Sequence, residues 1–135
     1  MTRVCLDSNV LVAAFAARGL CADLLRQVLT DFDLVLPQVV LDEVRRIFSE
    51  QLRLSPDAMA AFESVVERCE ILPATSLPSP VEVSDPDDER VLADAVAGGA
   101  DLLVTGDHDL LSVAAAAPIP ILSPRAFITV TRGGG

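Results

Sequence analysis

The stretch DPDDERVLADAVAGGADLLVTGDHDLL, residues 85–111, predicts a helix, a strand and an acidic turn in immediate succession. The helix is expected from about Asp87 to Ala97, because Gly98 and Gly99 form a C-terminal stop signal. The apolar run at residues 100–105 is typical of a buried strand. This strand leads directly to Asp107, so a carboxylate is expected at its C-terminal end.

The same alternation of strands and helices continues along the rest of the chain. Further strands are predicted at 3–7, 33–37, 69–73 and 118–122, and further helices from about Val10 and at 20–29, 38–52, 55–68 and 110–117, with a helical turn at 123–128. The proline-rich residues 73–86 are expected to form a loop. The pattern predicts a single three-layer α/β domain, in which helices flank a central parallel sheet of about five strands. The domain is expected to span residues 1–132, with 133–135 as a flexible glycine tail.

The composition excludes several classes of function. The chain has 135 residues, a formal net charge of −10 and ten basic residues, all of them arginine. Without lysine there is no Walker A phosphate loop and no Schiff-base chemistry. The net charge argues against a nonspecific nucleic-acid binder with a broad basic surface. It leaves a nuclease open, because part of the charge belongs to a candidate metal site.

No segment predicts a membrane span or a secretory leader. No apolar run reaches the roughly 18 to 20 residues that a span needs, and no basic and apolar leader precedes the first strand. The three cysteines are widely spaced among apolar residues, which is typical of small core side chains. A cytoplasmic location is therefore expected.

Four carboxylates fall where predicted strands end or helices begin: Asp7, Glu43, Asp88 and Asp107. In parallel sheets, ligands bind at the carboxyl ends of the strands. Burying ionised carboxylates there is costly unless another group compensates the charge. A shared cation is the simplest compensation, and hard oxygen ligands suit Mg²⁺ or Mn²⁺. The sequence therefore predicts one acidic site for metal-assisted phosphoryl chemistry.

Helical periodicity distinguishes Glu43 from its acidic neighbour. Glu43 shares a helix face with Val40 and Ile47, whereas Asp42 lies with Arg45. Glu43 is therefore expected to face inward. The alternative, a boundary residue whose carboxylate stays in water, remains open from the sequence. Two roles for the Arg45 side chain remain open: it contacts a phosphate, or it simply lies on the solvent-exposed face of the helix. The second is the simpler explanation.

Asp88 is distinguished from its neighbours in the same way. It aligns with the apolar Val91, while Asp87 aligns with Asp94 and is expected to face solvent. Acids near a helix N-terminus are also favoured by the helix dipole, which explains one or two of them without a site. Asp85 is accordingly predicted as a capping residue or a supporting group.

The acids of the TGDHD turn follow a buried strand. This position favours Asp107 as a ligand and leaves Asp109 as a supporting group, although both are also common turn residues. His108 lies between them and is predicted to be a surface histidine. The general base is then expected to be metal-activated water.

These segments together resemble the PIN domain nucleases, and in particular the small prokaryotic VapC-like toxins of toxin–antitoxin pairs. The resemblance rests on LDSNVLVAA at 6–14, Glu43 after a proline-ended strand, DPDD and VTGDHDLL within 85–111, and ILSPRAFI at 121–128. It implies cleavage of RNA, commonly single-stranded, to a 5′-phosphate and a 3′-hydroxyl, and a small antitoxin protein as partner. The implied metal ligands are Asp7, Glu43, Asp88 and Asp107 for one or two Mg²⁺ or Mn²⁺ ions, with Asn9, Thr105 and Asp109 in support.

Other classes of function remain open at this stage. A haloacid-dehalogenase-type phosphatase would need a second aspartate where Asn9 stands, and also a lysine. A TOPRIM-like site lacks the expected glutamate in an earlier strand. A degenerate scaffold that binds a partner without turnover is disfavoured by the presence of all four acids. The chain has no Tyr or Trp to form an evident base-stacking platform, and a homodimer is an open option.

Overall fold

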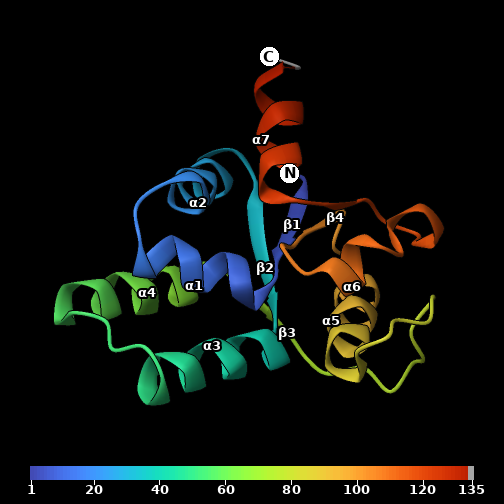
Figure 1. Ribbon diagram of the computed structural model, residues 1–135, viewed down its shortest axis with the longest axis horizontal. Coiled ribbons are helices and arrows are strands. Elements are labelled where there is room, and N and C mark those ends of the chain that lie inside the picture. Colours follow the sequence, from blue (N-terminus) through green and yellow to red (C-terminus); the bar gives the residue numbers. More distant parts are fainter. Residues whose placement is uncertain (134–135) are drawn as a thin grey trace.

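The computed structural model describes residues 1–133, and it contains one five-stranded parallel sheet with helices on both sides (Figure 1). The strands are β1 (Arg3–Leu6), β2 (Asp33–Pro37), β3 (Glu70–Leu72), β4 (Leu102–Val104) and β5 (Ile121–Leu122). The helices are α1 (Ser8–Ala16), α2 (Leu20–Asp31), α3 (Gln38–Glu50), α4 (Pro56–Arg68), α5 (Pro86–Ala97), α6 (His108–Leu111) and α7 (Pro124–Gly133), with a 3-10 turn at Ala114–Ala116. The predicted three-layer α/β architecture is confirmed.

The strand order β3-β2-β1-β4-β5 puts β1 at the centre of the sheet. Val4 pairs with Leu34 of β2 on one side and with Leu102 of β4 on the other. Helices α1 to α4 lie on one side of the sheet, and α5 and α6 lie on the other (Figure 1). Since β1 is covered on both faces, it is made of fully buried residues at Val4, Cys5 and Leu6.

The cysteines are free thiols, as expected from the apolar residues around them. Cys5 is completely buried in β1, and this burial raises the pKa of its thiol. Burial also raises the pKa of the half-buried Cys21 and Cys69. A thiol with a raised pKa is a poor nucleophile at neutral pH.

The prediction of a helix at 110–117 is wrong. Helix α6 ends at Leu111, and the alanines after it form only a 3-10 turn. Ala117 is extended (φ −76°, ψ 148°) because it precedes Pro118, and the residue before a proline is disfavoured in the helical region. The predicted terminal turn is, conversely, the ten-residue helix α7. The predicted glycine tail begins at Gly133, which ends this helix, and residues 134–135 lie outside the described residues.

Asp94 differs from the solvent-facing position predicted for its side of the helix. It is only 2% exposed, and its Oδ1 accepts hydrogen bonds from the Thr75 backbone N–H at 2.9 Å and from Arg90 at 3.2 Å. Arg90 also donates to the carbonyl of Thr75 at 2.9 Å. These bonds attach the proline-rich loop to α5, the helix that carries Asp88. Asp87, in contrast, is exposed as predicted.

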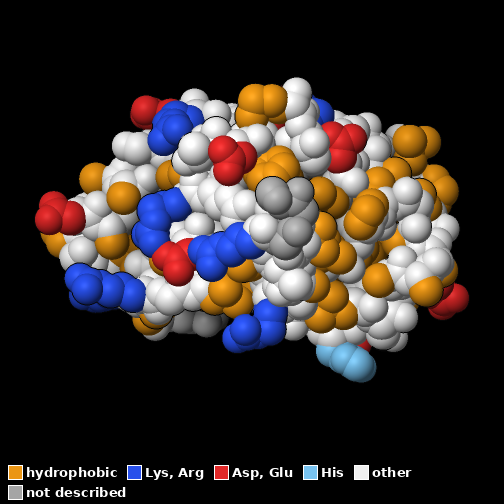
Figure 2. Space-filling model, turned by 90° about the horizontal axis from the view of Figure 1, so that it is seen from above, with side chains coloured by type: hydrophobic (Ala, Val, Ile, Leu, Met, Phe, Trp, Pro, Cys, Tyr) orange, Lys and Arg blue, Asp and Glu red, His pale blue; other side chains and the backbone are white. Residues whose placement is uncertain are grey.

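The surface charge is unevenly distributed. Figure 2 shows the face above α2 and α7, where arginine side chains gather on one half and apolar side chains on the other. Val130 of α7, 61% exposed, is one of the exposed large apolar residues of the chain.

Within residues 1–133 no single helix is long and apolar enough to cross a membrane. Helices α1 and α2 meet that test of length and composition only as a pair, and this pair is bent by 107°.

Candidate active site

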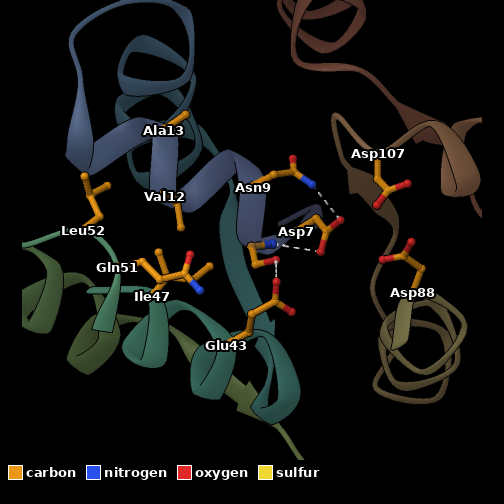
Figure 3. A pocket seen from close by; sticks show the side chains of 11 residues that line it. Asp7, Asn9, Val12, Ala13, Glu43, Ile47, Gln51, Leu52, Asp88 and Asp107 are labelled. Carbon is orange, nitrogen blue, oxygen red and sulfur yellow. Dashed lines mark hydrogen bonds between the residues drawn. The ribbon is translucent and has the colours of Figure 1, made fainter. Parts of the chain in front are cut away.

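A cavity of about 590 Å³ lies at the carboxyl edge of the sheet, next to the ends of β1 and β4 (Figure 3). Asp7, Glu43, Asp88 and Asp107 line one half of it. The other half is lined by Val12, Ala13, Ile47, Gln51 and Leu52, and Ser8 and Asn9 complete the wall. All four acids predicted from the sequence therefore line one cavity.

Asp7 follows the central strand and is almost fully buried, with 2% of its surface exposed. Its Oδ2 accepts hydrogen bonds from the Thr105 hydroxyl at 2.7 Å and the Asn9 amide at 3.1 Å. Its Oδ1 accepts from the backbone N–H of Ser8 at 2.8 Å, which caps the start of α1. Burial raises the pKa of Asp7, while the bonds from Thr105 and Ser8 act in the opposite direction. The nearby Glu43 carboxylate adds to the increase.

Asn9 and Thr105 also position the turn that carries Asp107. The Asn9 side-chain oxygen accepts a hydrogen bond from the Gly106 backbone N–H at 2.9 Å. Thr105 Oγ1 accepts from the Asp107 backbone N–H at 3.0 Å. A Cβ atom at Gly106 would lie 3.2 Å from the Asn9 oxygen, which explains why glycine fits this close approach. Asn9 and Thr105, two of the predicted supporting residues, thus join the ends of β1 and β4.

Glu43 reaches the cavity from α3, on the inward face predicted from periodicity (Figure 3). Its Oε1 accepts a hydrogen bond from the Ser8 hydroxyl at 3.0 Å. The neighbouring Asp42 is exposed and accepts a hydrogen bond from Gln38 at 2.8 Å, away from the cavity. Ser8 was not predicted as a site residue, because an N-terminal serine of a helix is ordinarily explained by capping alone.

Asp88 and Asp107 face Asp7 from the opposite wall (Figure 3). Burial, together with the Asp107 carboxylate, raises the pKa of Asp88 to about 7, and Asp7 and Asp85 add to the increase. Its buried Oδ2 has no hydrogen-bond partner among residues 1–133. Asp107 itself caps α6, with its Oδ1 accepting from the Asp109 N–H at 2.8 Å. Asp88 therefore presents an unsatisfied oxygen next to other acids.

The predicted supporting acids lie beside Asp88. Carboxylate oxygens of Asp85, Asp88 and Asp109 all lie within 4.8 Å of one another. Asp85 is the N-cap of α5 and accepts hydrogen bonds from the N–H groups of Asp87 and Asp88, as expected for a capping residue. His108 is exposed and does not line the cavity.

The donor set fits a hard divalent cation. Every charged group of the cavity is a carboxylate. The buried Oδ2 of Asp88 has no hydrogen-bond donor among residues 1–133, and a bound cation would satisfy it instead. Burial and, to a smaller extent, the neighbouring carboxylates raise the pKa of Asp7 and Asp88, and a cation would offset the repulsion among these carboxylates. Asp85, Asp88 and Asp109 have carboxylate oxygens close enough to share such an ion, and Asp88 also lines the cavity together with Asp7, Glu43 and Asp107.

The sequence profile of the PIN domain matches residues 3–109. The chain belongs to the PIN domain family. This PIN domain is similar in fold to VapBC2 from Rickettsia felis, solved bound to a DNA fragment from their promoter, with 14% identity, a TM-score of 0.66 and coverage of 90% of this chain and 98% of the other. It is also similar to a domain of a functionally unknown protein from Methanocaldococcus jannaschii, with 16% identity, a TM-score of 0.59 and coverage of 90% and 89%. No curated protein sequence matches it significantly.

Replacing Asp88 with asparagine is expected to stabilise the metal-free PIN domain. The raised pKa means that folding favours the protonated carboxyl, so this contribution to stability is full below pH 4 and is lost as the pH rises through about 7. Asparagine cannot ionise and escapes that loss. In EDTA at pH 8 the melting temperature should rise by about 2 to 6 °C, and the gain should shrink at pH 5, as measured by calorimetric melting. Equal melting temperatures at pH 8 would argue against close convergence of the acids.

Proposed function

We propose that this PIN domain is a metal-dependent endoribonuclease of the cytoplasm and the toxin of a toxin–antitoxin pair. The observation that carries the proposal is the convergence of Asp7, Glu43, Asp88 and Asp107 on one cavity at the carboxyl edge of the sheet. PIN domains as a family are nucleases, and residues 3–109 match that family.

The residues of the cavity have separable roles in such a reaction. When bound, Mg²⁺ or Mn²⁺ supplies Lewis-acid stabilisation of charge on the attacked phosphate and lowers the pKa of water. Asp7 and Asp88 hold their carboxylates toward this position from opposite walls, and the hydroxyl of Ser8 orients Glu43 at 3.0 Å. Thr105 and Asn9 keep Asp7 in one rotamer by bonding the same oxygen. These bonds favour the ionised form of Asp7, which is the form that binds a cation.

The toxin assignment is supported by the sequence resemblance to VapC-like toxins and by the fold shared with VapBC2 from Rickettsia felis. It predicts a small antitoxin protein as partner. The cavity concentrates negative charge, so a basic or polar segment of the antitoxin would be attracted to it and would block the path of the RNA phosphate. Inhibition by the antitoxin should then compete with RNA.

The proposal is tested by incubating the purified protein with a single-stranded RNA in Mg²⁺ or Mn²⁺. Cleavage is expected with either ion and should stop in EDTA, because the acids alone repel the phosphate. The products should end in 5′-phosphate and 3′-hydroxyl, identified by mass spectrometry. Products ending in a 2′,3′-cyclic phosphate would instead indicate attack by the ribose hydroxyl and a contaminating ribonuclease. Metal binding without cleavage of any RNA or DNA would favour a scaffold that has lost turnover.

A further inference from the structure

The acidic half of the cavity continues into an apolar half between α1 and α3 (Figure 3). Val12 and Ala13 line it from α1, and Ile47 lines it from α3. Gln51 and Leu52, directly after α3, form its outer end. The proposed chemistry uses none of these five residues, so this part of the cavity needs an explanation of its own.

Backbone hydrogen bonds join the outer end of the cavity to α3, although its side chains are exposed. The backbone N–H groups of Gln51 and Leu52 both donate to the carbonyl of Ile47, at 2.9 and 2.8 Å. Leu52 is 38% exposed, one of the exposed large apolar residues of the chain. The side-chain amide of Gln51 forms no hydrogen bond with any residue between 1 and 133, so its donor and acceptor are free for a ligand.

We propose that this apolar half is a nucleobase subsite, which binds the base of a nucleotide adjoining the scissile phosphate, and that Gln51 selects among bases. The inference rests on the proposed ribonuclease function. It follows from continuity, because a phosphate at the acidic half leaves the attached nucleoside to enter the adjoining space. The base is the part of a nucleotide with large apolar faces, which suit Val12, Ile47 and Leu52.

The size and aliphatic lining of the cavity suit a base packed between aliphatic side chains rather than a base stacked on an aromatic ring. The whole cavity, about 590 Å³, lies within the range of about 300 to 1,000 Å³ typical of small-ligand sites. Among residues 1–133 no aromatic residue lines it, because Phe15 and Phe48 both pack edge-on against Phe62, at 5.4 and 5.3 Å between ring centroids. A base would therefore pack between aliphatic side chains, a mode that nucleobase pockets also use.

The hydrogen-bonding edge of the base would meet Gln51. A primary amide offers both a donor and an acceptor, and it can pair with two adjacent groups of a base edge. The four bases differ in the order of donors and acceptors on their edges, so a single amide favours some of them over others. Leu52, in contrast, can only contribute apolar contact and should not distinguish bases.

The subsite is tested first by binding, without any need for cleavage. The four nucleoside 5′-monophosphates are titrated into the protein in Mg²⁺ while the methyl signals of Val12, Ile47 and Leu52 are followed by NMR. All three should shift, with affinities that differ among the bases, and ribose 5-phosphate should leave them unchanged. Absent shifts, or equal shifts with ribose 5-phosphate, would overturn the subsite. Shifts caused only by the antitoxin would also overturn it and would identify a protein-docking surface.

The second test measures cleavage of four RNAs that differ in the one base beside the scissile phosphate. Wild type should prefer one base by about tenfold in kcat/KM, and Gln51→Ala should reduce that preference to about twofold. Leu52→Ala should raise KM for all four RNAs while keeping the preference. The matched controls are Gln38→Ala, a glutamine at the start of α3 and outside the cavity, and Leu77→Ala, an exposed leucine in the proline-rich loop.

The two levels of inference fail in different ways. RNA cleavage with a base preference that Gln51→Ala leaves intact would overturn the subsite while the ribonuclease function stands. Base-dependent binding without cleavage would support the subsite and overturn the proposed turnover. An equal loss of preference in Gln51→Ala and Gln38→Ala would also count against a specific role of Gln51.

Discussion

Asp7→Asn is expected to reduce RNA cleavage by at least about 100-fold without unfolding the protein. Asn retains the shape of Asp7 and can still accept a hydrogen bond from the Thr105 hydroxyl, which lies 2.7 Å from Oδ2. It removes the negative charge that would hold the cation at the end of β1. Initial rates on single-stranded RNA measure the loss, and circular dichroism checks the fold.

The control is Asp42→Asn, which removes the same charge from an exposed position on α3. Its cleavage rate should stay within about twofold of wild type, since exposed charges outside the cavity contribute little. Calorimetric titration with Mn²⁺ should separate the two variants as well, with weaker binding only in Asp7→Asn. Similar losses in both variants would contradict the assignment of inward and outward acids, and cleavage surviving in Asp7→Asn would point to a contaminant.

The sheet was predictable because its strands are short apolar runs that each lead to a helix. Arg3–Leu6 is followed at once by the capping Asp7, and Asp33–Pro37 is followed by α3. Buried parallel strands have this composition because helices cover both faces. The inward face of Glu43 was predictable for a related reason, since Glu43 shares its helix face with the apolar Val40 and Ile47.

The errors occur where tertiary contacts or local backbone effects override helix periodicity. The alanines after Leu111 have high helix propensity, yet Pro118 holds Ala117 extended and ends the turn. Asp94 was grouped with a polar face, but the loop at Thr75 and the guanidinium of Arg90 satisfy its carboxylate in a buried position. Arg90 lies one helical turn before Asp94, but Thr75 is 19 residues away in the proline-rich loop, so periodicity alone did not reveal the burial.

The apolar half of the cavity was missed for a different reason. Val12 and Ile47 fall on apolar helix faces, so in the sequence they are indistinguishable from core residues. The space between Val12 and Ile47 arises from the way α1 and α3 pack in the folded protein, which also places Gln51 at its outer end. An apolar stripe on a helix indicates that this face is covered, but it does not indicate what covers it.

Expression of this protein alone should slow the growth of a bacterial host, because an unregulated RNA-cutting domain would degrade the RNA of its own cell. Asp7→Ala should remove the effect, since it removes the carboxylate between Thr105 and Asn9 that the proposed cation needs. Co-expression of the proposed antitoxin, which would block the acidic cavity, should restore growth. Growth curves of the three strains, with soluble protein measured in each, check the prediction.

The wild-type and Asp7→Ala strains separate toxicity of catalysis from toxicity of overexpression. Asp42→Ala is the matched control, because it removes an exposed carboxylate of α3 and leaves the cavity intact, so it should remain as toxic as wild type. Equal growth of all strains at equal soluble protein would argue against a toxin. Toxicity that persists in Asp7→Ala would argue that the harm arises elsewhere than at the proposed cation site.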